Sequence, residues 1–269
     1  LLLSACTKLD EHLYSSLDAN NFYKNEQECI LAMGDSYTRM AYQGGNLWGI
    51  YGTQVATTDE AVIPSRIKGP FLGNNGIWLD LHEHKFKPNN NPILSSWQFS
   101  FTTAASCIQV IYQIEKSPTQ FNNKPNMVAE LKALRSYAYY VALDLFGNIP
   151  ISLDFADTTL PKQYTRAEAF KIIEKDLKDN LSLLNPIPSQ LNYGRATKNL
   201  AFTVLAKMYM NADVWLGTPM WQEAINMCDS IIIPEHYFLE PNYYKNFAIA
   251  NENSRENIFV IPYDRKLGF

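Results

Sequence analysis

Residues 130–151 read ELKALRSYAYYVALDLFGNIPI and carry the clearest structural pattern in the chain. Apolar side chains recur there at three- and four-residue spacing, which predicts a helix from about Pro125 to Phe146. Gly147 suits the position after a helix C-terminus, and Pro150 just beyond it cannot continue the helix. Arg135 is a charge among apolar neighbours, so we expect it to cap backbone carbonyls or to pair with an acid.

Five further helices are predicted by the same spacing. One follows Asn25, one starts at Pro92, and the others cover about 165–184, 196–212 and 221–233. With no long strands between them, they predict an all-α array in which 125–184 and 196–233 form helical hairpins. Five small residues would let these helices approach closely: Ala133, Ala138, Ala142, Ala201 and Ala206. The match to a strict 34-residue tetratricopeptide (TPR) period is poor, so the array is TPR-like.

The stretch from Gly44 to Asn91 has a different composition. It contains seven glycines, three prolines and two of the five tryptophans. Such a composition excludes long helices and predicts a loop-rich insertion with one or two short strands. Since binding residues gather on loops held by a rigid scaffold, 44–91 is the candidate ligand region.

The overall composition excludes several classes of protein. The chain of 269 residues has a net charge of −4 and scattered basic residues, unlike a nucleic-acid-binding protein. Aromatic residues make up 13% of it. Cys29, Cys107 and Cys228 lie inside apolar helical patterns and form no Cys-x-x-Cys pair, which predicts three buried thiols and no disulfide framework.

The first residues, LLLSACTKLDE, run from apolar to polar at Cys6. Leu3-Ser4-Ala5-Cys6 fits the lipobox of bacterial lipoproteins, where the cysteine sulfur receives a lipid and the chain is cut before it. We therefore expect residues 1–5 to be the remnant of a signal peptide and 6–24 a lipidated tether. An ordinary core strand is the alternative. No stretch after Cys6 reaches the ~18 apolar residues that a transmembrane helix needs.

Several blocks together resemble the SusD/RagB family of outer-membrane nutrient-binding lipoproteins. In chain order they are TTDEAVIPSR (57–66), GIWLDLHEHKF (76–86), the block at 130–151, GRATKNLAFTVLAKMYMNADVW (194–215) and SRENIFVIPYD (254–264). The resemblance implies TPR-like helical hairpins, a place on the cell surface and no enzymatic activity or cofactor. It also implies that the protein holds oligosaccharides or other nutrients for a SusC-type TonB-dependent transporter. Members are usually about twice as long, so we expect 25–269 to be the N-terminal region of such a protein.

Sugar recognition needs flat aromatic faces and planar polar groups. The loop-rich insertion supplies both, and the candidates for ligand binding are Trp78, Arg66, Asn74, Asn75 and Asp80. Trp78 lies beside Ile77 and Leu79, so a role as a core anchor is the alternative. The resemblance transfers no single residue of this loop.

The sequence offers residues for two other site chemistries. Asp80, His82 and His84 would share one face of a strand, a spacing that could bind zinc. Zinc sites need three or four ligands with supporting groups around them, and no further histidine lies nearby in the sequence, so we expect no metal. A secreted all-α glycoside hydrolase would need two carboxylates across the bond, and the neighbours Asp59 and Glu60 point in different directions. A structural surface lipoprotein without a ligand is the third possibility.

Overall fold

The computed structural model describes residues 22–44, 48–64, 76–187 and 189–263. Its α-helices are α1 (Glu26–Gly44), α2 (Ile50–Ala56), α3 (Ile77–His82), α4 (Asn91–Lys116), α5 (Lys124–Phe146), α6 (Arg166–Asn180), α7 (Lys198–Met210), α8 (Ala212–Leu216) and α9 (Trp221–Ile232). Short 3-10 helices are η2 (Leu181–Leu183), η3 (Gln190–Asn192) and η4 (Tyr243–Phe247). Strands β1 (Ile149–Pro150) and β2 (Gln163–Tyr164) form one antiparallel pair.

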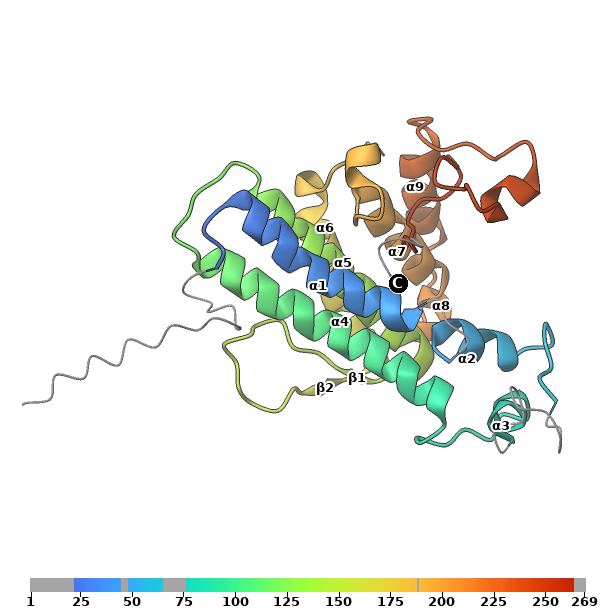
Figure 1. Ribbon diagram of the computed structural model, residues 1–269. Coiled ribbons are helices and arrows are strands. Elements are labelled where there is room, and N and C mark those ends of the chain that lie inside the picture. Colours follow the sequence, from blue (N-terminus) through green and yellow to red (C-terminus); the bar gives the residue numbers. More distant parts are fainter. Residues whose placement is uncertain (1–21, 45–47, 65–75, 188, 264–269) are drawn as a thin grey trace, which may run out of the picture.

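The long helices stack side by side, as Figure 1 shows. α4 packs along α5 on one side and along α1 on the other, while α6 packs on α5 and α7 on α9. The predicted hairpins 125–184 and 196–233 are therefore confirmed, and α4 with α5 forms a third antiparallel pair. Among the described residues, no helix combines the length and apolarity that crossing a bilayer requires.

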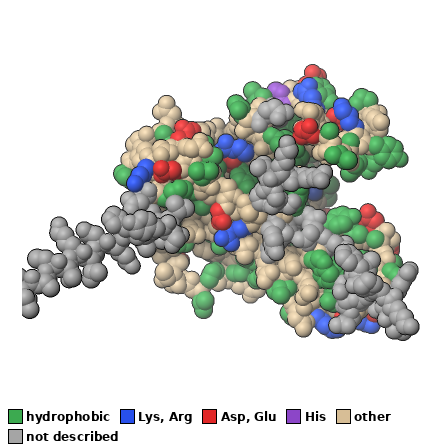
Figure 2. Space-filling view, in the orientation of Figure 1, with side chains coloured by type: hydrophobic (Ala, Val, Ile, Leu, Met, Phe, Trp, Pro, Cys, Tyr) green, Lys and Arg blue, Asp and Glu red, His purple; other side chains and the backbone are tan. Residues whose placement is uncertain are grey.

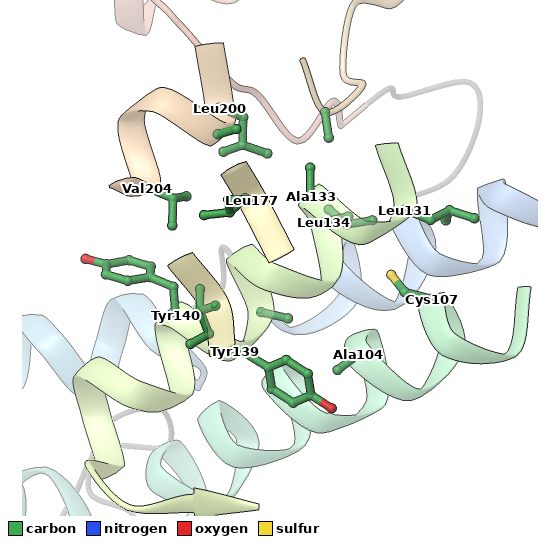
Figure 3. Close-up of a cluster of buried hydrophobic side chains, with 14 of the residues drawn as sticks. Ala104, Cys107, Leu131, Ala133, Leu134, Tyr139, Tyr140, Leu177, Leu200 and Val204 are labelled. Atoms are coloured by element: carbon green, nitrogen blue, oxygen red, sulfur yellow. The ribbon is translucent and has the colours of Figure 1, made fainter. Parts of the chain in front are cut away.

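The core lies between α1, α4, α5, α6 and α7, and Figure 3 shows part of it. Leu131, Leu134 and Ala138 of the predicted α5 face are fully buried. The five alanines predicted to allow close approach are all buried as well. Small side chains at these positions let neighbouring helices lie close, which explains why α5 can contact several helices at once.

The chain leaves α5 through Gly147, as the sequence predicts. Its φ of +75° lies in a region that L-residues with a side chain rarely adopt. A Cβ there would also lie 3.0 Å from Arg166 Nη2. The sharp exit leads directly into β1, which pairs with β2 at the start of α6.

Two expectations are wrong. Cys29 and Cys107 are buried thiols, but Cys228 is exposed, because α9 packs inward through Ala224, Met227 and Ile231. In the described part of 44–91 the chain forms the short helices α2 and α3 and no strand. At seven and six residues both helices are short, and together they contain one glycine, Gly52 of α2, and no proline.

Residues 1–21 lie outside the described residues. The lipobox at Cys6, the signal remnant 1–5 and the tether 6–24 therefore stay predictions.

Candidate ligand-binding site

The segment between α1 and α4 positions the candidate site. α3 begins after Gly76, whose φ of +80° is in the left-handed region. The turn after α3 is tied back to this helix, because Asn90 Nδ2 donates a hydrogen bond to Ile77 O at 3.1 Å. Lys85 N likewise donates to Asp80 O at 2.7 Å. These bonds hold the residues after α3 beside the first turns of α4.

Trp78 lies in a small core rather than on the surface. Only 1% of it is exposed, and it packs with Ala56 and Leu81. Its ring centroid lies 5.1 Å from that of Trp48. The described arrangement thus matches the core-anchor alternative and leaves no face of Trp78 open to a sugar, so a ligand contact by this residue stays a prediction that the geometry does not favour.

Asp80 forms an ion pair with Lys87, with Nζ and Oδ2 2.7 Å apart. Lys87 lines the apolar groove described below, so its ion pair places Asp80 near the edge of that groove. Arg66, Asn74 and Asn75 lie outside the described residues. Their predicted role in binding a ligand stays a prediction.

The histidines near Asp80 do not share one face of a strand, because the segment is helical. His82 ends α3, and His84 Nε2 donates a hydrogen bond to Thr57 O at 2.9 Å. His84 also stacks on Phe86 with ring centroids 5.6 Å apart. Within the part of the chain that the structure describes, no cluster of three metal-ligating side chains occurs.

An apolar groove opens beside this segment, and we call it the aromatic groove. Its lining consists of Phe86, Lys87, Pro88, Ile93, Leu94, Trp97 and Phe146, and its volume is about 470 Å³. This volume is within the range of small-molecule sites. Three separate segments therefore meet here: the turn after α3, the start of α4 and the last residue of α5. Figure 2 shows exposed hydrophobic side chains at the lower right, where α2 and α3 lie in Figure 1.

The aromatic rings in the groove are exposed and held in place. Phe86 is 58% exposed and Trp97 is 37% exposed. Trp97 packs edge-to-face on Phe146 at 5.1 Å between centroids and against Phe101 at 4.3 Å. Such rings can receive the C–H face of a pyranose, while the Lys87–Asp80 pair offers charged hydrogen-bonding groups at the edge.

The sequence did not single out these rings. Trp97 falls on an apolar helical stripe with Phe101 and Ala104, which predicts a core position. The position of these residues near helix ends could have indicated their exposure. Trp97 lies in the second turn of α4, and Phe146 is the last residue of α5. Aromatic residues at helix ends beside a loop-rich segment are well placed to stay partly exposed.

Two curated proteins illustrate the similarity of this chain to known sequences. Starch-binding protein SusD of Bacteroides thetaiotaomicron is 30% identical over 135 residues, 49% of this chain and 24% of that protein. SusD-like protein P2 of Formosa agariphila is 24% identical over 98% of this chain and 51% of that protein. The chain thus spans about half or less of the length of these curated relatives.

The fold is similar to that of solved structures. Surface glycan-binding protein A from Bacteroides thetaiotaomicron in complex with laminarihexaose matches 88% of this chain and 49% of its own, with a TM-score of 0.71 and 20% identity. Together with the hairpins described above, this likeness confirms the all-α, TPR-like array.

The model of a protein family described as "Starch-binding associating with outer membrane" matches residues 52–210 of the chain. The matched range includes α3 to α7 and is more than half of the 269 residues. It confirms the resemblance found in the sequence blocks, and this chain belongs to the SusD-like family.

Proposed function

We propose that this protein binds a glycan at the outer surface of the cell and delivers it to a SusC-type TonB-dependent transporter. The observation that carries the proposal is the aromatic groove, in which Trp97 and Phe86 present rings to solvent beside the Lys87–Asp80 pair. Shape, ring stacking and hydrogen bonding would hold the ligand without breaking a bond.

The relatives support a carbohydrate as the ligand. SusD is named a starch-binding protein, and the surface glycan-binding protein was solved with laminarihexaose. Both ligands are glucans with neutral sugar rings. Each pyranose has an apolar C–H face, which suits the partly exposed rings of Trp97 and Phe86.

The hydrolase alternative finds less support among the described residues. Asp59 and Glu60 are exposed on the turn after α2, and the carboxylate of Asp80 is engaged with Lys87. A general acid and a nucleophile or base need two carboxylates facing each other across a bound sugar. We therefore propose capture rather than cleavage.

Anchoring through Cys6 and transfer to the transporter complete the proposal. A lipidated Cys6 would hold the helical array outside the outer membrane, where the transporter takes up the glycan. Cys6→Ala should move the protein from the membrane fraction to the soluble fraction. The same variant should also lose co-purification with a TonB-dependent transporter, whereas unchanged fractionation would contradict the anchor.

Calorimetry with maltohexaose and laminarihexaose tests the binding site. Phe86→Ala and Trp97→Ala should each weaken binding of the preferred glucan by at least about tenfold, equivalent to about 1.4 kcal/mol. Trp221→Ala is the control, because Trp221 is a tryptophan on α9 that is 53% exposed and lies outside the groove. Phe86 is more than half exposed, so its loss should leave the melting temperature unchanged.

The outcomes separate the candidate functions. Release of shorter glucans during the titration would favour the hydrolase. Equal affinity in the wild type and both groove variants would contradict the groove as the site. No binding to any glycan in a wider panel would favour the structural lipoprotein.

A further inference from the structure

A second cavity lies between the turn before α7 and the segment after α9, and we call it the polar pocket. Its volume is about 390 Å³, which is in the range of small-molecule sites. One wall comes from residues 189–197 and the other from 236–237 and 251–260. In Figure 1 this part of the chain lies at the upper right, whereas α3 and the start of α4 lie at the lower right. None of its lining residues lines the aromatic groove.

The lining is rich in neutral polar groups. Amides and phenols predominate among the side chains, with Asn192, Asn251, Asn253, Asn257, Tyr193 and Tyr237. An amide can both donate and accept, and a phenol can do either. Within the protein, Asn192 Nδ2 already donates to Ile187 O, Asn192 Oδ1 accepts from Ser189 N, and Asn251 Nδ2 donates to Asn246 O, so Asn257 and the phenols carry the argument. This combination matches the hydroxyl groups of a sugar, which also donate and accept.

Two buried hydroxyls at the pocket have no hydrogen-bond partner in the protein. They are Thr197 Oγ1 and Tyr237 Oη. Thr197 is only 4% exposed, and although it is the N-cap residue of α7, its side chain makes no capping hydrogen bond. Buried polar atoms normally find partners, so two orphaned hydroxyls lining one cavity point to a ligand that supplies them.

The surroundings of Tyr237 agree with this geometry. Burial raises the pKa of Tyr237, and the nearby Thr197 and Asn199 side chains lower it in part. Although these three polar groups lie close together, Tyr237 Oη has no hydrogen bond of normal geometry with either neighbour. A ligand hydroxyl could supply the hydrogen bonds that Tyr237 Oη and Thr197 Oγ1 lack.

The charges at the pocket favour a neutral ligand over an anion. Arg195 makes a bidentate ion pair with Glu130, with Nη2–Oε2 at 2.6 Å and Nε–Oε1 at 2.9 Å. Arg255 stacks on Phe238 and donates a hydrogen bond to His236 O. Glu252 adds a negative charge to the lining. The positive charges are thus engaged or balanced, which leaves little excess to attract a carboxylate. Figure 2 shows Lys or Arg, Asp or Glu and a histidine mixed over this region.

The inner wall is held in place before any ligand arrives. Tyr37 Oη donates to Glu130 Oε1 at 2.5 Å and accepts a hydrogen bond from Ala196 N at 2.8 Å. Together with the Arg195–Glu130 pair, this network fixes the turn before α7 to α1 and α5.

The outer wall has its own network. Glu256 accepts hydrogen bonds from Glu240 N and Asn246 Nδ2 at 2.9 and 2.7 Å. The two walls meet where Pro262 packs on Gly194, since a Cβ on this glycine would lie 2.9 Å from Pro262 Cγ. Because both walls are fixed by these internal contacts, the pocket would lose little conformational entropy when a ligand binds.

We infer that the polar pocket is a second carbohydrate site, which takes a neutral hexose unit through hydrogen bonds from its hydroxyls to Thr197, Tyr237 and Asn257. The inference rests on the proposed carbohydrate-binding function and adds a site that is separate from the aromatic groove. The aromatic groove would bind sugar rings by stacking, and the polar pocket would bind sugar hydroxyl groups by hydrogen bonds.

The test is an NMR titration of the full 269-residue chain with methyl α- and β-glucoside, laminarihexaose and maltohexaose. Amide signals of residues 189–199 and 251–258 should shift with at least one of these neutral sugars. Methyl glucuronide, which differs by one carboxylate, should bind at least about tenfold more weakly. Thr197→Val combined with Asn257→Ala should weaken binding at these signals by at least tenfold.

The variants separate this inference from the proposed function. Thr197 Oγ1 makes no hydrogen bond of normal geometry, so Thr197→Val should fold with a melting temperature close to that of the wild type, and Asn257→Ala provides an independent variant. Phe86→Ala should weaken the signals of the groove and leave those of the polar pocket unchanged. Shifts confined to the groove, or equal binding by the double variant and the wild type, would overturn the inference while the proposed function stands. Shifts confined to the polar pocket would support the inference and contradict the groove. No shift at the pocket with any neutral sugar would also overturn it.

Discussion

Arg135 of α5 and Asp176 of α6 form a bidentate ion pair in the interior of the array. Arg135 Nη2 lies 2.7 Å from Asp176 Oδ2 and 2.9 Å from Oδ1, and the two side chains are only 3% and 13% exposed. Arg135 Nη1 also donates to Leu153 O at 3.2 Å, and Ser136 Oγ donates to Asp176 Oδ2 at 2.8 Å. One pair therefore joins α5, α6 and the segment after β1.

Breaking this ion pair should strongly destabilise the protein. Arg135→Met leaves the Asp176 carboxylate buried without its partner, so we expect a loss of about 3–5 kcal/mol in the free energy of unfolding. Urea unfolding measures this loss. Arg39→Ala is the control, because the Arg39–Asp35 pair of α1 is about half exposed and should cost no more than about 1 kcal/mol. Equal costs for both variants would show that Asp176 is solvated.

Two glycine-to-alanine changes should have opposite effects. Gly147→Ala forces a side chain into a positive-φ conformation and against Arg166, which should cost about 1–3 kcal/mol of stability. Gly34 lies in α1 with no atom within 4 Å of an added Cβ. Gly34→Ala should therefore stabilise the protein by about 0.5–1 kcal/mol. Thermal unfolding of both variants checks the pair, and a gain at Gly147 would contradict the strained exit from α5.

The partly buried carboxyl group of Asp144 should make the folded protein less stable as pH rises. Burial raises the pKa of Asp144, while the charges of Lys207 and Arg166 lower it in part. A carboxyl with a raised pKa in the folded state holds its proton more tightly there than in the unfolded chain, so stability falls as pH rises from its ordinary pKa through the raised one. Asp144→Asn should thus stabilise the protein at pH 7, and the gain should shrink as pH falls through this window.

Lys207→Met provides the companion experiment. Removal of this positive charge should raise the pKa of Asp144 further and so enlarge the stabilisation that Asp144→Asn gives at pH 7. Urea unfolding between pH 4 and pH 7 measures both effects. A gain from Asp144→Asn that is the same at every pH would exclude the carboxylate as its source.

The described cysteines should differ in reactivity. Burial raises the pKa of Cys107 to about 12, and burial also raises the pKa of Cys29. The thiolate is the reactive form, so both should resist alkylation in the folded protein. Exposed Cys228 should react with iodoacetamide at pH 8 within minutes, and peptide mass spectrometry can follow each site. Rapid labelling of Cys107 in the folded protein would contradict the packing of α4 on α5.

Much of the secondary structure was predictable because its signals are local. The sequence predicts a helix from about Pro125 to Phe146, and α5 covers Lys124–Phe146. The helix predicted from about residue 165 is α6, which begins with a capping box formed by Thr165 and Glu168. Spacing within one helix decides such features, so neighbours in the sequence suffice.

Exposure of individual side chains was less predictable. Trp78 and Trp97 both lie among apolar residues, yet one is buried and the other borders the aromatic groove. Cys228 follows the same apolar pattern as Cys29 but lies on the uncovered face of α9. Which face of a short helix is covered depends on its partner, and the sequence of the helix does not contain that information.

The sequence by itself determined the six longer helices, the approximate positions of their ends, the small residues at close contacts and the blocks that mark the family. Tertiary structure alone decided that Arg135 meets Asp176 and that Phe86, Trp97 and Phe146 border one groove. It also decided that Thr197 and Tyr237 share one pocket. The physical reason is range: helix periodicity and capping act over three or four residues, whereas these contacts join segments tens of residues apart and form only when the helices pack.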